Sequence, residues 1–473
     1  MARAWHITTN RLRTEGPDPT MSDDLRPDRH TSEMTLRRRD TRRAAGPVAL
    51  VAAVASIASL SIPRPDHGDT SHAAAPLPHA RLAISDLTYR GAFRLPSGTF
   101  GESSTNYAVG TLAHHPANDS IFIAGHAQQN AVGEFAIPTP IGTGNDVDDL
   151  PVAESLQPFA AFLGDAPTGN PDGIDRINGL HVDDGSLIVN AERWYDAAGT
   201  AVDTTLVLDA DDLDGDVSGY FELDGRTHAG GYMSDVPDEW RDALGNRLLT
   251  GWASNTSIIS RHSIGPTLFT FDPDDLTDRD ATIDPTISTD VHMDFPYAGQ
   301  RWITPDALDT QPGSASPLWN HLSRARYGFI APGTSTFVVL GSTGGVDSGI
   351  GYKITQDNDN LCGGYCAYAA DDYSNAYWLF DVNDILAADD VHLPQPYAYG
   401  EWSVPFDDGG RHGIIGGSFD PATSTLYLAL DGAGQVGTYD RPPLVVVFDV
   451  PTTPNGFSIT ELASALRRAE RVD

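Results

Sequence analysis

The sequence predicts an all-β fold, and specifically a β-propeller, on three observations. From residue 82 onward, short runs of β-branched and aromatic residues alternate with clusters of Gly, Pro, Asp and Asn, which is the pattern of strands and turns. No amphipathic helix longer than about ten residues interrupts this pattern except at 460–471. Two sequence phrases recur along the chain, and recurrence of this kind indicates repeated structural units.

The first phrase is a turn followed by a strand, and it occurs at 115–123 and 420–428. The second is a strand ending in Phe-Asp followed by a turn, at 269–276 and 379–386, with weaker copies at 206–213 and 448–450. Strands are expected most clearly at 120–125, 186–190, 336–341 and 425–430.

Alternation of the two phrases is what successive strands of propeller blades produce. About 390 residues at roughly 50 to 65 residues per blade give six to eight blades, and we expect seven. A large sandwich, or two all-β domains, is the alternative.

The N-terminal segment has the organisation of an export signal. Ten arginines occur in the first 43 residues, and an uncharged run rich in Ala and Val follows at 44–60. That run is short for a membrane span, which needs about 20 residues. We therefore expect 1–75 to be an export signal with an N-terminal segment outside the fold, and 76–473 to be a single propeller domain. The mature protein would be secreted, without a stable membrane span; an uncleaved N-terminal anchor is the alternative.

The charge of the chain is strongly acidic. It carries 65 Asp and Glu against 30 Lys and Arg, a net charge of −35, and its one lysine is Lys353. Because phosphate binding needs clustered basic residues, this balance excludes nucleic acid as a partner. A dense carboxylate surface is also suited to high salt, where self-repulsion is screened. We expect an acidic, monomeric protein.

Two features suggest cross-links or metals. Cys362 and Cys366 are the two cysteines, and in an exported protein a small-loop disulfide is the first interpretation and zinc the second. Asp212, Asp214 and Asp216 resemble the start of a calcium loop, but Val217 replaces the expected glycine and no glutamate follows at the right distance. This segment either holds a structural Ca²⁺ or is a solvated acidic turn. No other cofactor is predicted.

Several segments resemble a group of secreted bacterial β-propeller proteins, and the likeness covers most of 87–450. The segments are 89–96 (YRGAFRLP), 112–126 (LAHHPANDSIFIAGH), 231–266, 377–381 and 416–421. The group is distantly similar to the seven-bladed polysaccharide lyases called ulvan lyases. This resemblance implies a lyase that degrades a polysaccharide containing uronic acid by β-elimination.

Such a lyase needs a base for the C5 proton, an acid for the leaving oxygen, and a group that neutralises the carboxylate. His126 ends a predicted strand and could be the base. Arg193 and Tyr195 are two residues apart, so they would share one face of a strand, and an arginine there would make the phenol more acidic. Tyr232 is a second candidate acid or sugar platform.

Arg261 and His262 point opposite ways if they lie on a strand, and we expect Arg261 to be the one that faces the site. Either Arg193 or Arg261 would neutralise the carboxylate. His181, Asn178 and Arg326 are predicted to bind substrate. Each candidate has an ordinary structural explanation as well: a hydrogen-bonded histidine, an aromatic core residue, or a solvated loop charge.

The alternative function is a non-catalytic, secreted propeller that binds a glycan or a protein. Glycoside hydrolysis by paired carboxylates is a third option, because the many acidic residues conceal any catalytic pair. The chain contains no Gly-x-Ser-x-Gly, His-Glu-x-x-His or phosphate-loop motif, so other common catalytic classes have no support.

Overall fold

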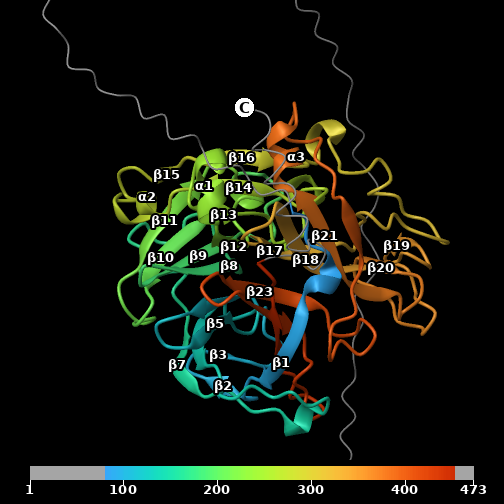
Figure 1. Ribbon diagram of the computed structural model, residues 1–473, viewed down its shortest axis with the longest axis horizontal. Coiled ribbons are helices and arrows are strands. Elements are labelled where there is room, and N and C mark those ends of the chain that lie inside the picture. The colour runs from blue at the N-terminus through green and yellow to red at the C-terminus, as the bar shows by residue number, and fades with distance from the viewer. Residues whose placement is uncertain (1–79, 453–473) are drawn as a thin grey trace, which may run out of the picture. The chain divides into compact units, whose positions relative to one another are not determined.

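The computed structural model describes residues 80–452, all within one compact unit of the chain (Figure 1). The predicted export signal at 1–75 and the predicted helix at 460–471 lie outside the described residues. Strands dominate the described part, which confirms the all-β prediction. Its α-helices are α1 (Asp238–Leu244), α2 (Asp274–Thr277) and α3 (Val382–Ala387). Between residues 80 and 452, no helix is long and apolar enough to cross a membrane.

Five sheets of four or five strands account for most of the fold. We number them as blades 1 to 5 in the order of their first strands. Blade 1 contains β4 (Leu112–His115), β5 (Ser120–Ala124), β6 (Val132–Ala136) and β7 (Ser155–Ala160). Blade 2 contains β8 (Arg176–Asp183), β9 (Ser186–Glu192), β10 (Thr205–Asp209), β11 (Ser218–Leu223) and, on its edge, β15 (Thr286–Ile287). Blade 3 contains β12 (Met233–Asp235), β13 (Leu248–Thr250), β14 (Leu268–Phe271) and β16 (Asp290–Met293).

Blade 4 contains β17 (Arg324–Ile330), β18 (Thr336–Gly344), β21 (Tyr373–Asp381) and β22 (Ala398–Glu401). Blade 5 contains β23 (Ile414–Asp420), β24 (Thr425–Leu430), β25 (Leu444–Asp449) and β1 (Thr88–Arg94). Two small hairpins complete the strands: β2 (Thr99–Phe100) with β3 (Ser103–Ser104), and β19 (Ile350–Tyr352) with β20 (Tyr365–Ala367).

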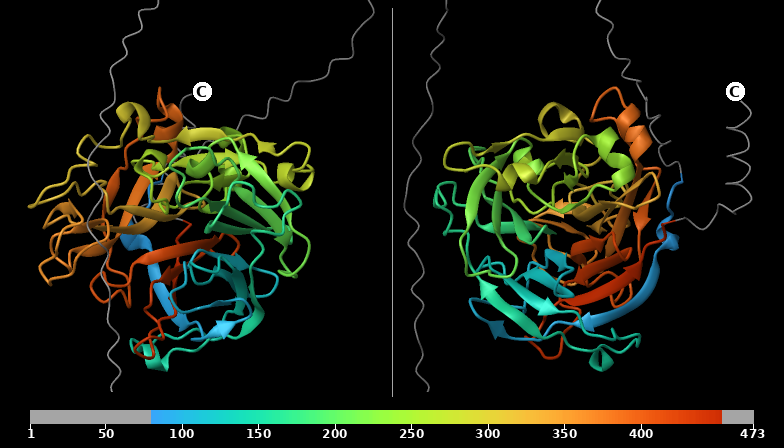
Figure 2. Two further views of the ribbon diagram at one scale, coloured as in Figure 1. Left: turned by 180° about the vertical axis from the view of Figure 1, so that it is seen from behind. Right: turned by 60° about the vertical axis from the view of Figure 1, so that its left-hand side comes forward.

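The first strand of each blade is its innermost strand, and these five strands form a closed ring. β4 lies beside β8 and β23, β12 lies between β8 and β17, and β17 lies beside β23 (Figures 1 and 2). Radial repetition of antiparallel sheets around such a ring defines a β-propeller. The propeller prediction is therefore confirmed.

The described residues contain five blades rather than the seven expected. The expected number came from dividing the chain length by an ordinary blade length. Here long connections take up the difference, since 294–323 precede β17 and 345–372 separate β18 from β21. The additional residues form long connections at one end of the blades and no further blades.

The recurring phrases mark fixed positions in the blades. The predicted strands at 120–125, 186–190, 336–341 and 425–430 correspond to β5, β9, β18 and β24, which are the second strands of four blades. The Phe-Asp phrases end β14, β21 and β25, and the weaker copy at 206–213 ends β10, so this phrase marks third strands. Side chains of these strands fill the spaces between neighbouring sheets, which is why the phrases are rich in apolar residues.

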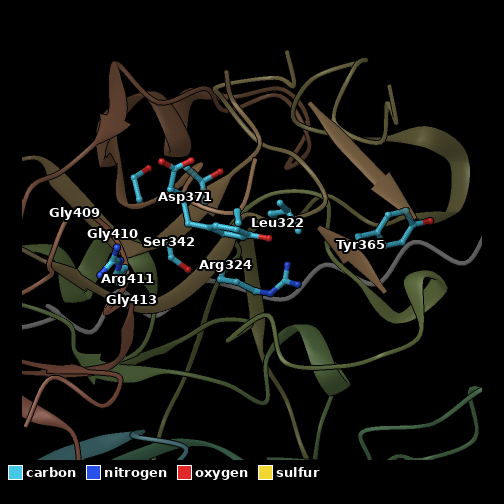
Figure 3. Close-up of a pocket in the computed structure, with 13 residues that line it drawn as sticks. Leu322, Arg324, Ser342, Tyr365, Asp371, Gly409, Gly410, Arg411 and Gly413 are labelled. Atoms are coloured by element: carbon cyan, nitrogen blue, oxygen red, sulfur yellow. The ribbon is translucent and has the colours of Figure 1, made fainter. Parts of the chain in front are cut away.

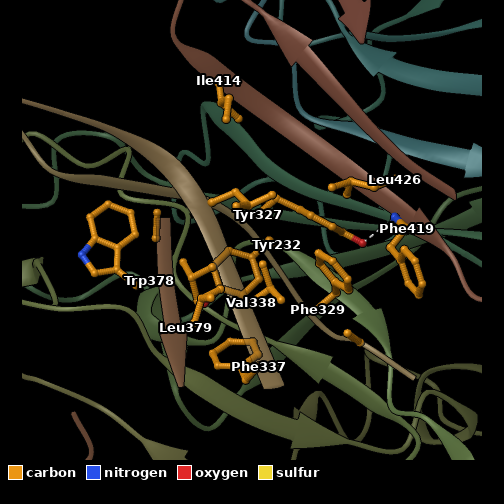
Figure 4. Packing of buried hydrophobic residues seen from close by; sticks show 14 of the residues in the cluster. Tyr232, Tyr327, Phe329, Phe337, Val338, Trp378, Leu379, Ile414, Phe419 and Leu426 are labelled. Atoms are coloured by element: carbon orange, nitrogen blue, oxygen red, sulfur yellow. Dashed lines mark hydrogen bonds between the residues drawn. The ribbon is translucent and has the colours of Figure 1, made fainter. Parts of the chain in front are cut away.

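Tyr327 shows how adjacent blades are joined. Its ring is buried between blades 4 and 5, and its hydroxyl oxygen accepts the backbone N–H of Phe419 at 2.7 Å (Figure 4). Phe329 stacks on Phe419 with ring centroids 4.6 Å apart. One hydrogen bond and one aromatic pair therefore fix the contact of β17 with β23 within an apolar cluster.

Blade 5 is completed by β1, the first strand of the described chain, which pairs with β25 from Thr88↔Asp449 to Arg94↔Leu444. Phe93 of β1 is fully buried in the cluster that contains Leu112, Val445 and Val447. Backbone hydrogen bonds and apolar burial thus join the two ends of the described chain in one sheet.

We expect Phe93→Ala to lower the free energy of unfolding by about 3–5 kcal/mol, because it removes a fully buried ring from the closing strand. Urea denaturation followed by tryptophan fluorescence measures this loss. The control is Leu156→Ala on β7, a half-exposed side chain, which should change stability by no more than about 0.5 kcal/mol. Equal effects of the two substitutions would contradict the role of β1.

Candidate functional site

Every blade repeats the same up-and-down order of strands, so the five innermost strands run in the same direction. We call the face where these strands begin the entry face and the opposite one the exit face. The connections 193–204, 251–267, 294–323, 345–372 and 402–413 all reach the entry face. Side chains from distant parts of the chain are therefore brought together there.

Two adjoining cavities on this face form what we call the entry groove. The first has a volume of about 520 Å³ and is lined mainly by Leu322, Arg324, Ser342, Tyr365, Tyr373 and Arg411 (Figure 3). The second has a volume of about 380 Å³ and is lined mainly by Trp194, Asn255, His262, His321, Arg324, Arg326 and Tyr365. Arg324 and Tyr365 line both, and Figure 3 places Arg324 between Arg411 and Tyr365.

Arg324 and Arg326 supply fixed positive charge to the groove. Arg324 donates hydrogen bonds from Nη1 to the carbonyls of His321 and Ser323, both at 2.9 Å. Arg326 donates to the Ala253 carbonyl at 3.3 Å, and its buried Nε has no partner. Within residues 80–452, neither guanidinium lies within 4 Å of a carboxylate. Protein encloses both side chains except where they face the cavity.

Burial lowers the pKa of both arginines, that of Arg326 to about 10, so both stay protonated at neutral pH. A half-buried cation without a counter-ion is costly, and an anionic ligand would relieve that cost. Arginine is well suited to the task because its planar fork can pair with both oxygens of a carboxylate. The groove therefore favours an anion although the whole chain is acidic.

His321 and Tyr365 lie face to face beside Arg324. Their ring centroids are 3.8 Å apart and their planes differ by 11°. Nε2 of His321 lies 3.0 Å from the Leu308 carbonyl, to which it must donate, so Nδ1 carries the lone pair of the neutral ring. Burial lowers the pKa of His321 and raises the pKa of Tyr365. At neutral pH the histidine can accept a proton and the tyrosine can donate one.

The disulfide between Cys362 and Cys366 encloses Tyr365, so a covalent loop of five residues holds this tyrosine at the groove. The structure pairs the two cysteines as a disulfide, which was the first of the two interpretations offered for them, and not as zinc ligands. Gly364 of the same loop lines the second cavity.

His262 forms part of the groove wall as a neutral group. Burial lowers its pKa to about 3, and its Nε2 donates to the Thr256 carbonyl at 2.8 Å. Its ring packs against Trp252 at 5.1 Å. His262 is thus fixed by hydrogen bonding and packing, which suits it to shaping the cavity.

Glu192 is buried at the end of β9, opposite Arg176 of β8. Neither of its carboxylate oxygens accepts a hydrogen bond of normal geometry from a described residue, although Asn178 is near enough to influence its ionisation. Burial raises the pKa of Glu192 to about 8, so the carboxyl is largely neutral at pH 7. Asn178 connects this carboxyl to the groove because its side-chain oxygen accepts from Asn255 at 2.9 Å.

The structure brings some of the predicted site residues to the groove and leaves others away from it. Arg326 lines the second cavity, and Asn178 lies next to it through Asn255. His126 follows β5, where its Nδ1 accepts from the Gln128 N–H, and it lines neither cavity. Arg193 and Tyr195 are exposed in the turn after β9, which ends at Glu192, so they share no strand face.

Three further predictions need correction. Tyr232 cannot meet a substrate, because it is 2% exposed in the core and its hydroxyl donates to the Thr267 carbonyl at 2.6 Å. Arg261 and His262 lie in and just after a 3₁₀ turn, Ile259–Arg261, not on a strand. His262 faces the groove, whereas Arg261 lines a different cavity. Nε of Arg261 lies 3.5 Å from a carboxylate oxygen of Asp196.

His181 was expected to bind substrate, but it does not line the entry groove. It lies within β8, three residues beyond Asn178 towards the exit face. Asp212, Asp214 and Asp216 are exposed in the turn after β10. That turn is not among the described groups of His, Cys, Asp and Glu side chains compact enough to hold a metal ion.

Neither Tyr365 nor Arg324 was singled out as a candidate from the sequence. The four-residue spacing of Cys362 and Cys366 was the one available signal for Tyr365, since a disulfide there fixes the residue between them. The contact between 321–326 and 365 depends on how two long loops fold, and the sequence carries no pattern for it.

Comparisons with known proteins add little to this picture. No protein-family model matches the chain, and no curated protein matches it in sequence. Among solved structures, a member of the DUF4221 family from Bacteroides vulgatus matches with 10% identity and a TM-score of 0.29, over 77% of this chain and 97% of that one. A similarity of this size carries no argument about activity.

The raised pKa of the buried Glu192 carboxyl can be tested through the pH dependence of the protein's stability. Its folded-state pKa of about 8 lies above the ordinary 4.5, so its contribution to stability is complete below pH 4.5 and is lost as pH rises to about 8. Between pH 4.5 and 8, the free energy of unfolding of wild type should fall by a few kcal/mol relative to that of Glu192→Gln. Chemical denaturation at a series of pH values measures the difference.

The matched control for this test is Glu154→Gln, which removes an exposed carboxyl and should alter stability by no more than about 0.5 kcal/mol. A stability difference between wild type and Glu192→Gln that stays constant from pH 4.5 to 8 would show that Glu192 is ionised in the folded protein.

Proposed function

We propose that this protein is an exported polysaccharide lyase that cleaves a uronic-acid-containing, ulvan-like polysaccharide by β-elimination. One observation carries the proposal: two arginines without counter-ions lie beside a stacked histidine and tyrosine in one groove. These are the three kinds of group that the reaction needs. The sequence resemblance to ulvan lyases agrees with this reaction, and the proposal does not rest on the structural comparisons.

In the proposed reaction, Arg324 and Arg326 pair with the carboxylate of a uronic acid. Neutralising this charge makes the neighbouring C5 proton more acidic. Nδ1 of His321 then takes that proton. The electron pair forms a C4=C5 double bond as the C4–O bond breaks, and the Tyr365 hydroxyl protonates the departing oxygen. The products are an unsaturated uronyl end and a new sugar hydroxyl, so atoms and charge balance.

Electrostatics restrict where the polymer can approach. A net charge of −35 repels a polyanion at long range, whereas Arg324 and Arg326 attract it within the groove. Salt screens exposed charges more than buried ones. Moderate salt should therefore weaken the repulsion more than the attraction and favour binding.

A non-catalytic glycan-binding propeller is the alternative, and the aromatic lining favours it. Trp194, Tyr365 and Tyr373 line the groove, and such rings can stack on sugars without any reaction. In that case the arginines would select an acidic glycan, and no bond would be cleaved.

The first experiment incubates the purified mature protein, at low and high salt, with a panel of uronate polysaccharides that includes ulvan. Absorbance in the ultraviolet from the unsaturated uronyl product is the readout. We expect a signal on at least one polymer. If no polysaccharide in the panel gave an increase in absorbance but at least one still bound, the non-catalytic binding propeller would be favoured.

Variants then test the roles of the residues. His321→Ala and Tyr365→Phe should each lower kcat by about 10²-fold or more, because each removes a proton-transfer group. Arg324→Ala should lower kcat/KM by a similar factor. His126→Ala, outside the groove, is the matched control and should retain activity; a loss confined to that variant would return the assignment to His126.

The pH dependence of kcat/KM offers an independent check. The pKa of His321 is lowered from 6.5 and that of Tyr365 is raised from 10.0, both by burial. The acid limb of the profile should therefore lie below pH 6.5 and the alkaline limb above pH 10. An acid limb above pH 6.5 would contradict the role of His321 as base.

A further inference from the structure

A second site lies near the exit face, between blades 2 and 3. His181 and Asp183 belong to β8, and Asp235 ends the neighbouring innermost strand, β12. One ligand atom from each of these three residues lies within 4.8 Å of the others. His181 and Asp183 are two residues apart on one strand, so both side chains point to the same side of it, towards blade 3.

His181 is the unusual member of the group. The residue is 9% exposed, and its buried Nε2 forms no hydrogen bond with a described residue. That nitrogen instead points towards Oδ1 of Asp235 at 3.7 Å, which is too long for a hydrogen bond. A buried imidazole nitrogen without a partner costs free energy, and a metal ion would satisfy it.

The local charge also favours a cation. Arg247 pairs with Asp183 at 2.7 Å and with Asp272 at 3.3 Å, and it also contacts Asp274. Three carboxylates therefore contact one guanidinium, and Asp235 adds a fourth negative charge beside His181, so the group is negative overall. Asp183 uses one lone pair on each oxygen for Arg247, which leaves further lone pairs for a metal.

We propose that His181, Asp183 and Asp235 bind a divalent transition-metal ion, Zn²⁺ in the first instance, that joins blades 2 and 3. An imidazole nitrogen with carboxylate oxygens suits zinc better than calcium, which prefers oxygen ligands alone. Ligand atoms in a tetrahedral zinc site lie about 3.3 Å apart, so His181 and Asp235 are already close to that spacing. Water would complete the coordination, since the side chains of Asp183 and Asp235 are 16% and 35% exposed.

The proposed metal site is separate from the entry groove and does not depend on lyase activity. Asn178, which connects to the groove, precedes His181 by three residues, about 10 Å along the strand. The expected role is structural, because the ligands come from innermost strands of adjacent blades.

The test uses the mature protein after treatment with EDTA, dialysed against ZnCl₂, with bound metal measured by mass spectrometry. Wild type should bind one zinc per chain, and Tm should rise by roughly 3 °C at a hundredfold excess over Kd. His181→Ala and the isosteric Asp235→Asn should each abolish both effects. The Asp212→Asn/Asp214→Asn double variant, in the exposed acidic turn, is the matched control and should bind like wild type.

Cobalt provides a readout that does not depend on variant stability. Co²⁺ added to the metal-free wild type should give the visible absorption bands of a tetrahedral site with nitrogen and oxygen ligands. No zinc uptake by wild type, or uptake unchanged in both His181→Ala and Asp235→Asn, would overturn the proposal. Stabilisation by Ca²⁺ but not by Zn²⁺ would overturn the assignment to a transition metal.

Discussion

The pairing of β1 with β25 is the interaction on which the rest of the structure depends. Without it, blade 5 would expose the edge of β25, and no sheet would join the first strand of the described chain to its last. The repeated up-and-down order of the blades sets the direction of every innermost strand, and the closed ring brings the connections of different blades together on the entry face. The groove is a consequence of that closure, because its lining comes from blades 2, 3, 4 and 5.

Much of the fold could be predicted because it is periodic. The turn-and-strand phrase and the Phe-Asp phrase identify second and third strands, whose apolar residues fill the spaces between blades. The number of blades could not be obtained in the same way, since a length per blade says nothing about where long loops are inserted. Residues 345–372 alone form a hairpin and a disulfide between two strands of one blade.

The candidate site was predicted less well than the fold, for a physical reason. Strand-end positions such as His126 were chosen from local pattern, but the groove is built by loops that approach one another only after the ring closes. Tyr232 was predicted to be a catalytic acid or a sugar platform, yet its ring is buried where Gly231 lets the backbone approach that of Gly251 and Ala253 closely. Only Arg326 and Asn178 were placed near the groove, and both lie on innermost strands, whose positions the repeat determines.

Closure by strands from opposite ends of the chain also affects how the protein folds. Residues 88–94 have no partner until residues 444–449 are available, so a chain still being synthesised cannot complete blade 5. The closing contact spans almost the whole domain, and contacts of such long sequence separation form slowly because a large loop must be ordered first. The last blade is therefore finished only after synthesis of the domain ends. Until then, β1 lacks the strand with which it pairs.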